Sequence, residues 1–220
     1  MIKLPNRKNS FGYENDFYLS CQNSRIGKLI IHYELFKMIN GLPGDIVECG
    51  IFKGMSLIRF ATFRNLFKMQ NKKKILGFDA FGKFPEAKFE QDKKLRKKFI
   101  KDSGNSGISK FQLLKILKNK KLDKKIELVK GNITKTIPQY VKQNPNLQIA
   151  LLNLDTDIYE PSITILNHLY PKIVKGGILI LDDYGFFPGE TKAVDEFFNG
   201  KEVDIKQFSF QKTPKYIIKK

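Results

Sequence analysis

Cysteine and histidine are scarce in this chain of 220 residues, which contains two of each. Cys21 and Cys49 are too few for a disulfide framework or for a cysteine-based zinc site. His32 and His168 stand far apart in the sequence, so a zinc site built on histidine is not expected. The chain also lacks a Walker phosphate loop, a G-x-S-x-G motif and a kinase signature. These absences argue against several large enzyme classes.

Long apolar runs are missing as well. No stretch approaches the roughly 20 residues that a membrane-spanning helix needs, and the opening MIKLPNRKNSFGYEND lacks the apolar core of a signal peptide. We therefore expect no membrane span and a cytoplasmic location. Hydrophobic residues make up 41% and charged residues 28% of the chain, as in a globular protein. The length suits one domain with a substantial core.

The charge is strongly positive, with a formal net value of +18. Residues 83–125 alone hold 15 Lys or Arg against 5 Asp or Glu, a net of +10. Basic surfaces bind phosphate, so this balance favours a nucleic-acid partner on charge alone. Few aromatic residues lie among these lysines, however, and single-stranded nucleic acid needs a stacking platform. A compositional bias on solvated helices explains the charge as well, and a basic rim that attracts a phosphate-bearing small substrate is the other interpretation.

Short apolar segments alternate with amphipathic ones along most of the chain. This alternation predicts a doubly wound, mostly parallel α/β sheet. A final antiparallel pair at residues 203–210 and 215–218 would make the sheet seven-stranded. The remaining strands are predicted at residues 45–49, 74–79, 126–129, 148–154 and 177–181, and the helices at 56–69, 110–119, 137–143, 161–170 and 191–198.

The N-terminal part of the chain has a different pattern. Residues 1–24 are polar and aromatic, and apolar residues at helical spacing follow from Ile26 to about Asn40. We interpret residues 1–40 as an N-terminal arm and helix of the same domain, and residues 41–220 as the main α/β domain. Residues 81–107 are expected to be irregular.

The first predicted strand ends in Glu48, Cys49 and Gly50, with Gly54 and Ser56 close behind. Ligands of open α/β sheets bind beyond the carboxyl ends of the strands. Gly50 permits a tight turn and leaves room for a ligand, and Gly54 opens the next helix. Glu48 would repel a pyrophosphate, but it suits a cationic, amine-bearing ligand such as S-adenosylmethionine. An ordinary strand-to-helix turn is the alternative.

The second predicted strand ends in Asp79, which follows Gly54 by 25 residues. A carboxylate at this place can accept two hydrogen bonds from a ribose diol. Together with Glu48 it indicates a nucleoside that lies across the first two strand ends. Asp79 could equally cap the loop that follows it.

Four acidic residues end the fourth and fifth predicted strands, namely Asp155, Asp157, Asp182 and Asp183. Carboxylates at neighbouring strand ends repel one another unless a cation lies between them. Oxygen ligands suit Mg²⁺ or a similar hard cation. Such a metal could hold an acceptor hydroxyl, lower its pKa and aim it at a methyl group. Loop capping is the alternative.

Five segments in this order resemble the macrocin O-methyltransferase family: GLPGDIVECGIFKGMS, LGFDAFGKFPE, GNITKTIP, LNLDTDIYEPSITILNHLYPKIVKGGILILDDYG and KAVDEFF. The resemblance runs from about Arg25 to about Phe198. It implies a class I, S-adenosylmethionine-dependent and Mg²⁺-dependent enzyme with a Rossmann-like fold that methylates sugar hydroxyls. Residues 41–220 would then be the methyltransferase domain. Family members often associate, so the resemblance is compatible with a homo-oligomer.

The resemblance also implies roles for individual residues. It puts Glu48, Gly50 and Ser56 at the methionine end of the cofactor and Asp79 on the ribose. Metal binding falls to Asp155, Asp182 and Asp183, and Asp155 is the candidate proton acceptor. Asn132 and Ile133, after the third strand, would lie near the adenine.

The expected activity is methyl transfer from S-adenosylmethionine to a hydroxyl of a sugar or of a sugar-containing small molecule, possibly one linked to a nucleotide. An RNA-modifying methyltransferase is the first alternative, and the charge favours it. No D/N-P-P-Y/F motif is present, however, so a nucleic-acid substrate is not preferred. A methyltransferase of a catechol-like phenol and a non-enzymatic nucleotide-binding module are the others.

Overall fold

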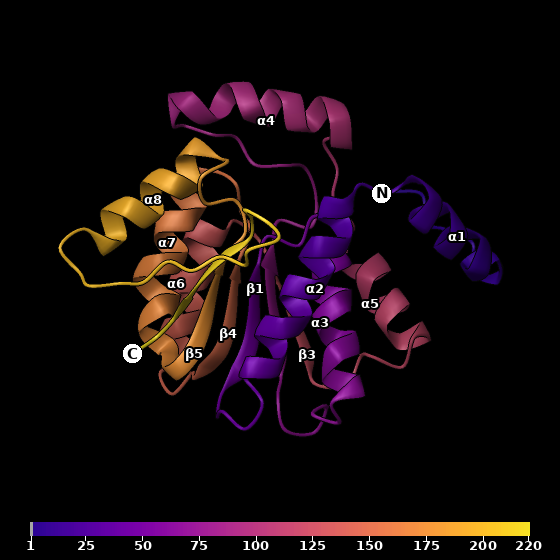
Figure 1. The fold of residues 1–220 in the computed structure, drawn as a ribbon, viewed down its shortest axis with the longest axis horizontal. Coiled ribbons are helices and arrows are strands. Elements are labelled where there is room, and N and C mark those ends of the chain that lie inside the picture. The colour runs from indigo at the N-terminus through magenta and orange to yellow at the C-terminus, as the bar shows by residue number, and fades with distance from the viewer. Residues whose placement is uncertain (1) are drawn as a thin grey trace.

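A computed structural model describes residues 2–220 of the chain and shows a sheet of six strands (Figure 1). The strands lie in the order β3-β2-β1-β4-β5-β6, and only β6 runs antiparallel to its neighbour. This is the doubly wound, mostly parallel arrangement that the sequence predicts. The strands are β1 (Asp45–Cys49), β2 (Ile75–Asp79), β3 (Ile126–Lys130), β4 (Ile149–Leu154), β5 (Ile173–Leu181) and β6 (Lys215–Ile218).

The prediction of a seventh strand at residues 203–210 is wrong. Within this segment only Lys206 pairs with β6, through a single bridge to Tyr216. The apolar side chains explain the difference, because Val203 and Ile205 pack against one face of the sheet and Phe208 against the other. The segment therefore wraps around the sheet edge and cannot run along it as a strand.

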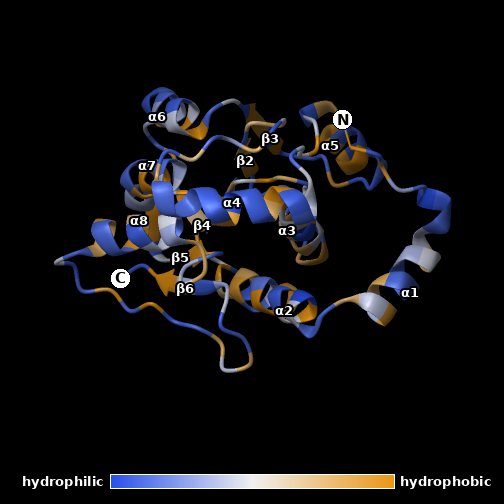
Figure 2. Cartoon of the chain, turned by 90° about the horizontal axis from the view of Figure 1, so that it is seen from above, coloured by the Kyte–Doolittle hydropathy of each residue, from blue (hydrophilic) through white to orange (hydrophobic). Residues whose placement is uncertain are grey.

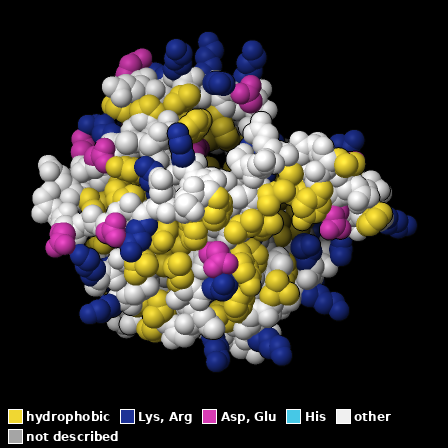
Figure 3. Space-filling view, in the orientation of Figure 1, with side chains coloured by type: hydrophobic (Ala, Val, Ile, Leu, Met, Phe, Trp, Pro, Cys, Tyr) yellow, Lys and Arg dark blue, Asp and Glu magenta, His cyan; other side chains and the backbone are white. Residues whose placement is uncertain are grey.

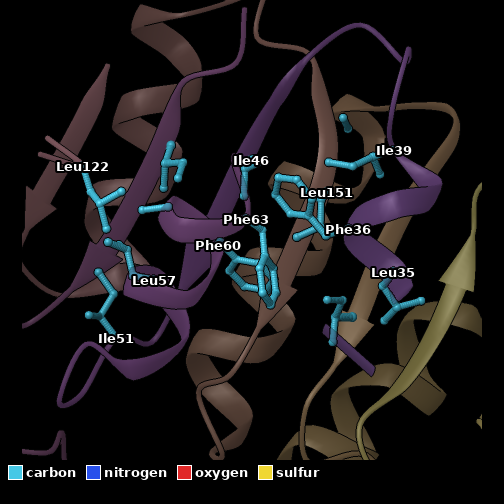
Figure 4. Packing of buried hydrophobic residues seen from close by; sticks show 14 of the residues in the cluster. Leu35, Phe36, Ile39, Ile46, Ile51, Leu57, Phe60, Phe63, Leu122 and Leu151 are labelled. Carbon is cyan, nitrogen blue, oxygen red and sulfur yellow. The ribbon is translucent and has the colours of Figure 1, made fainter. Parts of the chain in front are cut away.

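One face of the sheet is covered by α2 (Asn23–Met38), α3 (Met55–Leu66) and α5 (Lys110–Asn119). Phe36 from α2 and Phe60 from α3 are fully buried and stack at 6.4 Å between ring centroids. They pack over Ile46 and Leu151 of the central strands (Figure 4). Burial of this core fixes α2 and α3 against the sheet, and both helices carry residues of the candidate site.

The other face is covered by α6 (Ile133–Gln143), α7 (Tyr159–Leu169) and α8 (Pro188–Phe198), with a short 3-10 helix η2 (Tyr170–Lys172) after α7. Seen from above, these helices lie on the opposite side of the sheet from α2 (Figure 2). The termini of α7 and α8 matter most for function, because each helix begins just after an acidic strand end.

Residues 81–107, expected to be irregular, contain the helix α4 (Glu90–Ser103). It crosses above the carboxyl ends of the strands (Figures 1 and 2). Its sequence, EQDKKLRKKFIKDS, has no broad apolar stripe, and Asp92 is its only fully buried residue. The pattern of apolar residues could not reveal this helix, because its apolar contacts are few, chiefly those of Phe99 with Phe52 and Phe84, and its one fully buried side chain is acidic.

The N-terminal arm consists of a 3-10 helix η1 (Arg7–Asn9) and α1 (Ser10–Ser20), which has no buried residue and projects from the body (Figure 1). Among the residues that the structure describes, no helix is both long enough and apolar enough to cross a membrane.

Candidate active site

The acidic residues of the two strand ends meet above the sheet. The register pairs Leu154 of β4 with Leu181 of β5, so Asp155 and Asp182 follow side by side. Ligand oxygens of Asp155, Asp157 and Asp183 all lie within 4.8 Å of one another. Sequence reasoning placed all four acids at this edge, and the structure brings three of them into one group.

The three carboxylates of this group repel one another. Burial, followed by the charge of Asp182, raises the pKa of Asp155 well above its ordinary value. Burial also raises the pKa of Asp157 to about 8 and that of Asp183 well above its usual range. The carboxyl groups of Asp157 and Asp183 lie close together in this group, so a proton or another cation is needed to relieve their repulsion.

Asp157 has a left-handed backbone conformation, with φ of 62°. This region is unfavourable for a residue with a side chain, and such strain is concentrated at functional sites. The turn carries the carboxylate of Asp157 toward Asp183 on the neighbouring strand end. Sequence reasoning left the role of Asp157 open, and the geometry places it inside the cluster.

Asp182 is engaged by a lysine that sequence reasoning missed. Lys28 Nζ on α2 lies 2.5 Å from Asp182 Oδ2 and 3.8 Å from Asp155 Oδ2. Burial opposes the charge on Lys28, but the carboxylates of Asp182 and Asp155 outweigh it and raise the pKa of the ammonium above its ordinary value. The charge of Lys28 in turn holds the pKa of Asp182 below its ordinary value, against the effect of burial.

His32 lies one turn after Lys28 on α2 and is fully buried. Burial lowers its pKa to about 4, so the ring is neutral at pH 7. Arg59 has only donors, so its contact with Nδ1 at 3.1 Å leaves the ring proton on Nε2. Nε2 faces Asp182 Oδ1 at 3.8 Å, which is too long for a direct hydrogen bond. The contact between Arg59 and Nδ1 therefore fixes the tautomer of His32 in which the Nε2–H group faces Asp182.

The donor set fits a hard divalent cation. Three carboxylates converge within 4.8 Å, and oxygen ligands are what Mg²⁺ prefers. Asp182 Oδ1 and Glu190 Oε2 are also buried without a hydrogen-bond partner. Buried carboxylate oxygens in this number require a compensating positive charge.

The turn after β1 brings Glu48 and Ser56 together, as the Ser56 hydroxyl donates to Glu48 Oε1. Glu48 is fully buried, its Oε2 has no partner, and burial raises its pKa to about 8. Gly50 has a left-handed φ of 87°, and a Cβ at this residue would lie 1.6 Å from the Asp155 carbonyl oxygen. The tight turn expected at Gly50 is present, and it packs directly against the acidic end of β4.

Asp79 ends β2 and accepts hydrogen bonds from the backbone N–H groups of Ile51 at 2.7 Å and Phe52 at 3.1 Å. Asp79 thus holds the turn after β1. Its Oδ1 also accepts from the Phe81 N–H at 2.5 Å, so it caps the loop that follows it, which is the role considered as its alternative. A carboxylate has further acceptor sites, so contact with a ribose stays a prediction. Asn132 caps α6 by accepting from Thr134 N at 3.0 Å, and Ile133 is the first residue of that helix.

Two more buried acids brace the site, and neither was predicted. Glu190 Oε1 in the first turn of α8 accepts from Asp183 N at 2.9 Å. Asp92 of α4 accepts from Gly189 N at 2.7 Å and from Tyr159 N at 3.0 Å, which links α4 to the first turns of α8 and α7.

Comparison with known proteins identifies the family of this fold and site. The family model described as Macrocin-O-methyltransferase (TylF) matches residues 28–216. The chain belongs to the macrocin O-methyltransferase family. The match begins at Lys28, the residue that reaches Asp182, and includes every acid discussed above. The resemblance seen in the sequence motifs is confirmed.

Two relatives of this macrocin O-methyltransferase family member are named O-methyltransferases. Demethyldecarbamoylnovobiocin O-methyltransferase of Streptomyces niveus is 28% identical over 162 residues, which are 72% of this chain and 59% of the relative. Mycinamicin III 3''-O-methyltransferase of Micromonospora griseorubida is 25% identical over 163 residues, or 72% of this chain and 61% of the relative. The matches thus span less than two thirds of these relatives.

Solved structures confirm the Rossmann-like methyltransferase fold. The O-methyltransferase NovP superposes with a TM-score of 0.74 at 23% identity and covers 87% of this chain and 79% of its own. CalS11, a calicheamicin methyltransferase, gives a TM-score of 0.72 at 23% identity, with 93% of this chain and 83% of its own covered.

Proposed function

We propose that this family member is a divalent-metal-dependent O-methyltransferase that moves a methyl group from S-adenosylmethionine to a sugar hydroxyl. The main support for metal dependence is that Asp155, Asp157 and Asp183 converge within 4.8 Å of one another. They lie beside the turn after β1, where Ser56 donates to Glu48. Membership of the macrocin O-methyltransferase family supports methyl transfer, and the activities for which the relatives are named support a sugar acceptor.

Residues around β1 and β2 would hold the cofactor. Glu48, with a buried and unpaired Oε2, suits the amino group of the methionine moiety, and Ser56 orients its other oxygen. Gly50 has no side chain that would fill the turn after β1, and Asp79 holds that turn through the turn's own backbone N–H groups. The carboxylate of Asp79 would accept a further hydrogen bond from a ribose hydroxyl. Asn132 and Ile133 open α6, where the adenine is expected. S-adenosylmethionine supplies the methyl group.

Residues at the ends of β4 and β5 would hold the metal and the acceptor. The proposed ligands are Asp155 and Asp183, with Asp182 from the family pattern and Asp157 from its place in the cluster. A bound divalent cation supplies Lewis acidity that lowers the pKa of an acceptor hydroxyl. Asp155 would accept the hydroxyl proton, which is the role that the family pattern gives it.

The acceptor would bind under α4. A cavity of about 590 Å³ between α4 and α8 is lined by Phe89, Gln91, Phe186 and Lys192, among others, and Phe186 follows Asp183 by three residues. Aromatic walls with a few polar groups are typical of small-molecule sites. Figure 3 shows Lys and Arg side chains at the top of the molecule, where Figure 1 places α4. This basic edge favours a phosphate-bearing acceptor such as a nucleotide-linked sugar.

Isothermal titration with S-adenosylhomocysteine, with and without Mg²⁺, tests the proposal first. We expect micromolar binding of the cofactor product, followed by methylation of a sugar or nucleotide-sugar that stops in excess EDTA. Asp155→Asn should abolish turnover while S-adenosylhomocysteine still binds. Absence of binding under both conditions would refute the methyltransferase assignment, and full turnover in EDTA would refute the metal. Salt-sensitive RNA binding with RNA methylation would support the alternative substrate.

A further inference from the structure

Lys28 places a positive charge against the same carboxylates that are proposed to bind the metal. Its Nζ lies 2.5 Å from Asp182 Oδ2 and 3.8 Å from Asp155 Oδ2, and Asp155 also belongs to the three-carboxylate group. The side chain of Lys28 is 25% exposed, whereas that of Asp182 is 5% exposed. The ammonium therefore approaches the cluster from its open side.

The position of Lys28 is fixed by the core beneath it. Ile31 and Leu35 on the same helix are fully buried against the sheet, so the backbone of α2 cannot withdraw. The side chain itself has a flexible four-carbon stem and is anchored only by its charge. Lys28 can thus leave the carboxylates while α2 stays in place.

A divalent cation held by Asp155 and Asp182 would compete with this ammonium for the same two carboxylates. Asp155 cannot hold both at short range without strong repulsion between two positive charges. Lys, unlike Arg, is a compact and strongly hydrated charge that exchanges readily with water and ions. His32 is neutral and does not add a second cation on this side of Asp182.

We propose that Lys28 is the intrinsic counter-cation of the carboxylate cluster, and that a divalent cation displaces its ammonium from Asp155 and Asp182 on binding. The inference rests on the proposed metal site. Lys28 keeps the crowded acids stable in the metal-free protein and thereby weakens metal binding. It is a positioning residue of the site and takes no part in methyl transfer.

Titration of the full chain with Mn²⁺, followed by electron paramagnetic resonance of the free ion, tests this proposal. Lys28→Met removes the charge and keeps most of the volume, and Lys37→Met is the matched control on the exposed part of the same helix. We expect the Kd for Mn²⁺ to fall about tenfold or more in Lys28→Met, because a unit charge a few ångströms away is removed. Lys37→Met should keep the wild-type Kd, and Lys28→Arg, which keeps the charge, should not bind Mn²⁺ more tightly than the wild type.

Thermal unfolding gives a second readout. Without metal, Lys28→Met should melt below the wild type, and Mn²⁺ should raise its Tm by more than it raises that of the wild type. If the variant folds only with metal, it is purified with Mn²⁺ and its unfolding on chelation is measured, which supports the proposal equally.

An unchanged or larger Kd for Mn²⁺ in Lys28→Met would overturn the inference and leave the proposed function standing. Absence of Mn²⁺ binding in both the wild type and Lys28→Met would overturn the inference together with the metal dependence. Titration of the same samples with S-adenosylhomocysteine shows separately whether the methyltransferase assignment holds.

Discussion

Glu190 accepts a hydrogen bond from the backbone N–H of Asp183 at 2.9 Å, across the loop that separates β5 from α8. The backbone N–H of Glu190 donates in turn to the carbonyl of Asp157 at 3.2 Å. One residue thus ties both acidic turns together. The second oxygen, Oε2, is buried without a partner, and burial together with the charge of Asp183 raises the pKa of Glu190 well above its ordinary value.

Substitution of Glu190 tests its hydrogen bond to the backbone of Asp183. Glu190→Ala removes the acceptor for Asp183 N–H, and we expect metal affinity and turnover to fall by roughly 10- to 100-fold, as for other groups that orient metal ligands. Glu190→Gln keeps an acceptor oxygen, so its Mn²⁺ affinity should stay within a few-fold of the wild type. Titration with Mn²⁺ measures both. Equal affinities of the wild type and Glu190→Ala would show that Asp183 needs no such support.

Asp92 should anchor α4 above the site. Its carboxylate accepts from Gly189 N and Tyr159 N and is fully buried, so Asp92→Ala leaves two N–H groups without their acceptor. We expect a loss of about 2–4 kcal/mol in the free energy of unfolding and faster amide exchange throughout α4. Asp102→Ala, at an exposed position of the same helix, is the control and should change little. Chemical denaturation and hydrogen exchange test this, and slow exchange in Asp92→Ala would contradict it.

Gly50 and Gly41 form a matched pair, because both have φ of 87°. A Cβ at Gly50 would lie 1.6 Å from the Asp155 carbonyl oxygen, whereas nothing lies within 4 Å of one at Gly41. Gly41→Ala should therefore cost only the conformational penalty of about 1–2 kcal/mol. Gly50→Ala also forces the end of β4 to move, so it should be the more destabilising and should weaken S-adenosylhomocysteine binding. Equal denaturation midpoints for the two variants would contradict the close approach.

Much of the sheet could be predicted from the sequence, because strands buried on both faces are continuous apolar runs and their polar ends stand out. For the same reason Glu48, Asp79 and the four acids after β4 and β5 were assigned to the ligand-binding edge. The spacing of apolar residues could not reveal α4, whose one fully buried side chain is that of Asp92. It also could not reveal the path of residues 203–210, whose apolar side chains pack against both faces of the sheet.

The residues that support the acids were harder to find. Lys28 lies 154 residues from Asp182, and no local spacing relates the two. The only signal in the sequence is that Lys28 and His32 lie one turn apart among apolar residues of α2. Two polar residues at this spacing are equally expected on the solvent-exposed side of a helix. Glu190 resembles an ordinary first-turn helix acid. Long-range contacts of this kind depend on topology, so they emerge only once the strand order is known.

Cofactor binding should release protons through Glu48. Burial raises the pKa of this carboxyl to about 8, so at pH 7 it is mostly protonated in the free protein. A cationic amine beside Oε2 favours the carboxylate and lowers that pKa, so binding expels the proton. The affinity for S-adenosylhomocysteine should therefore rise as pH increases from 6 to 8, and then level off once Glu48 is ionised in the free protein.

Calorimetry in buffers of different ionisation enthalpy measures this release directly. At pH 7 the apparent binding enthalpy of the wild type should vary with the buffer, in proportion to the protons released. Glu48→Gln has no proton to lose and keeps an oxygen that can accept from Ser56, so its binding enthalpy should lose this dependence. Its affinity should be lower and nearly constant across the same pH range. A buffer-independent enthalpy for the wild type would show that Glu48 does not meet the amino group of the ligand.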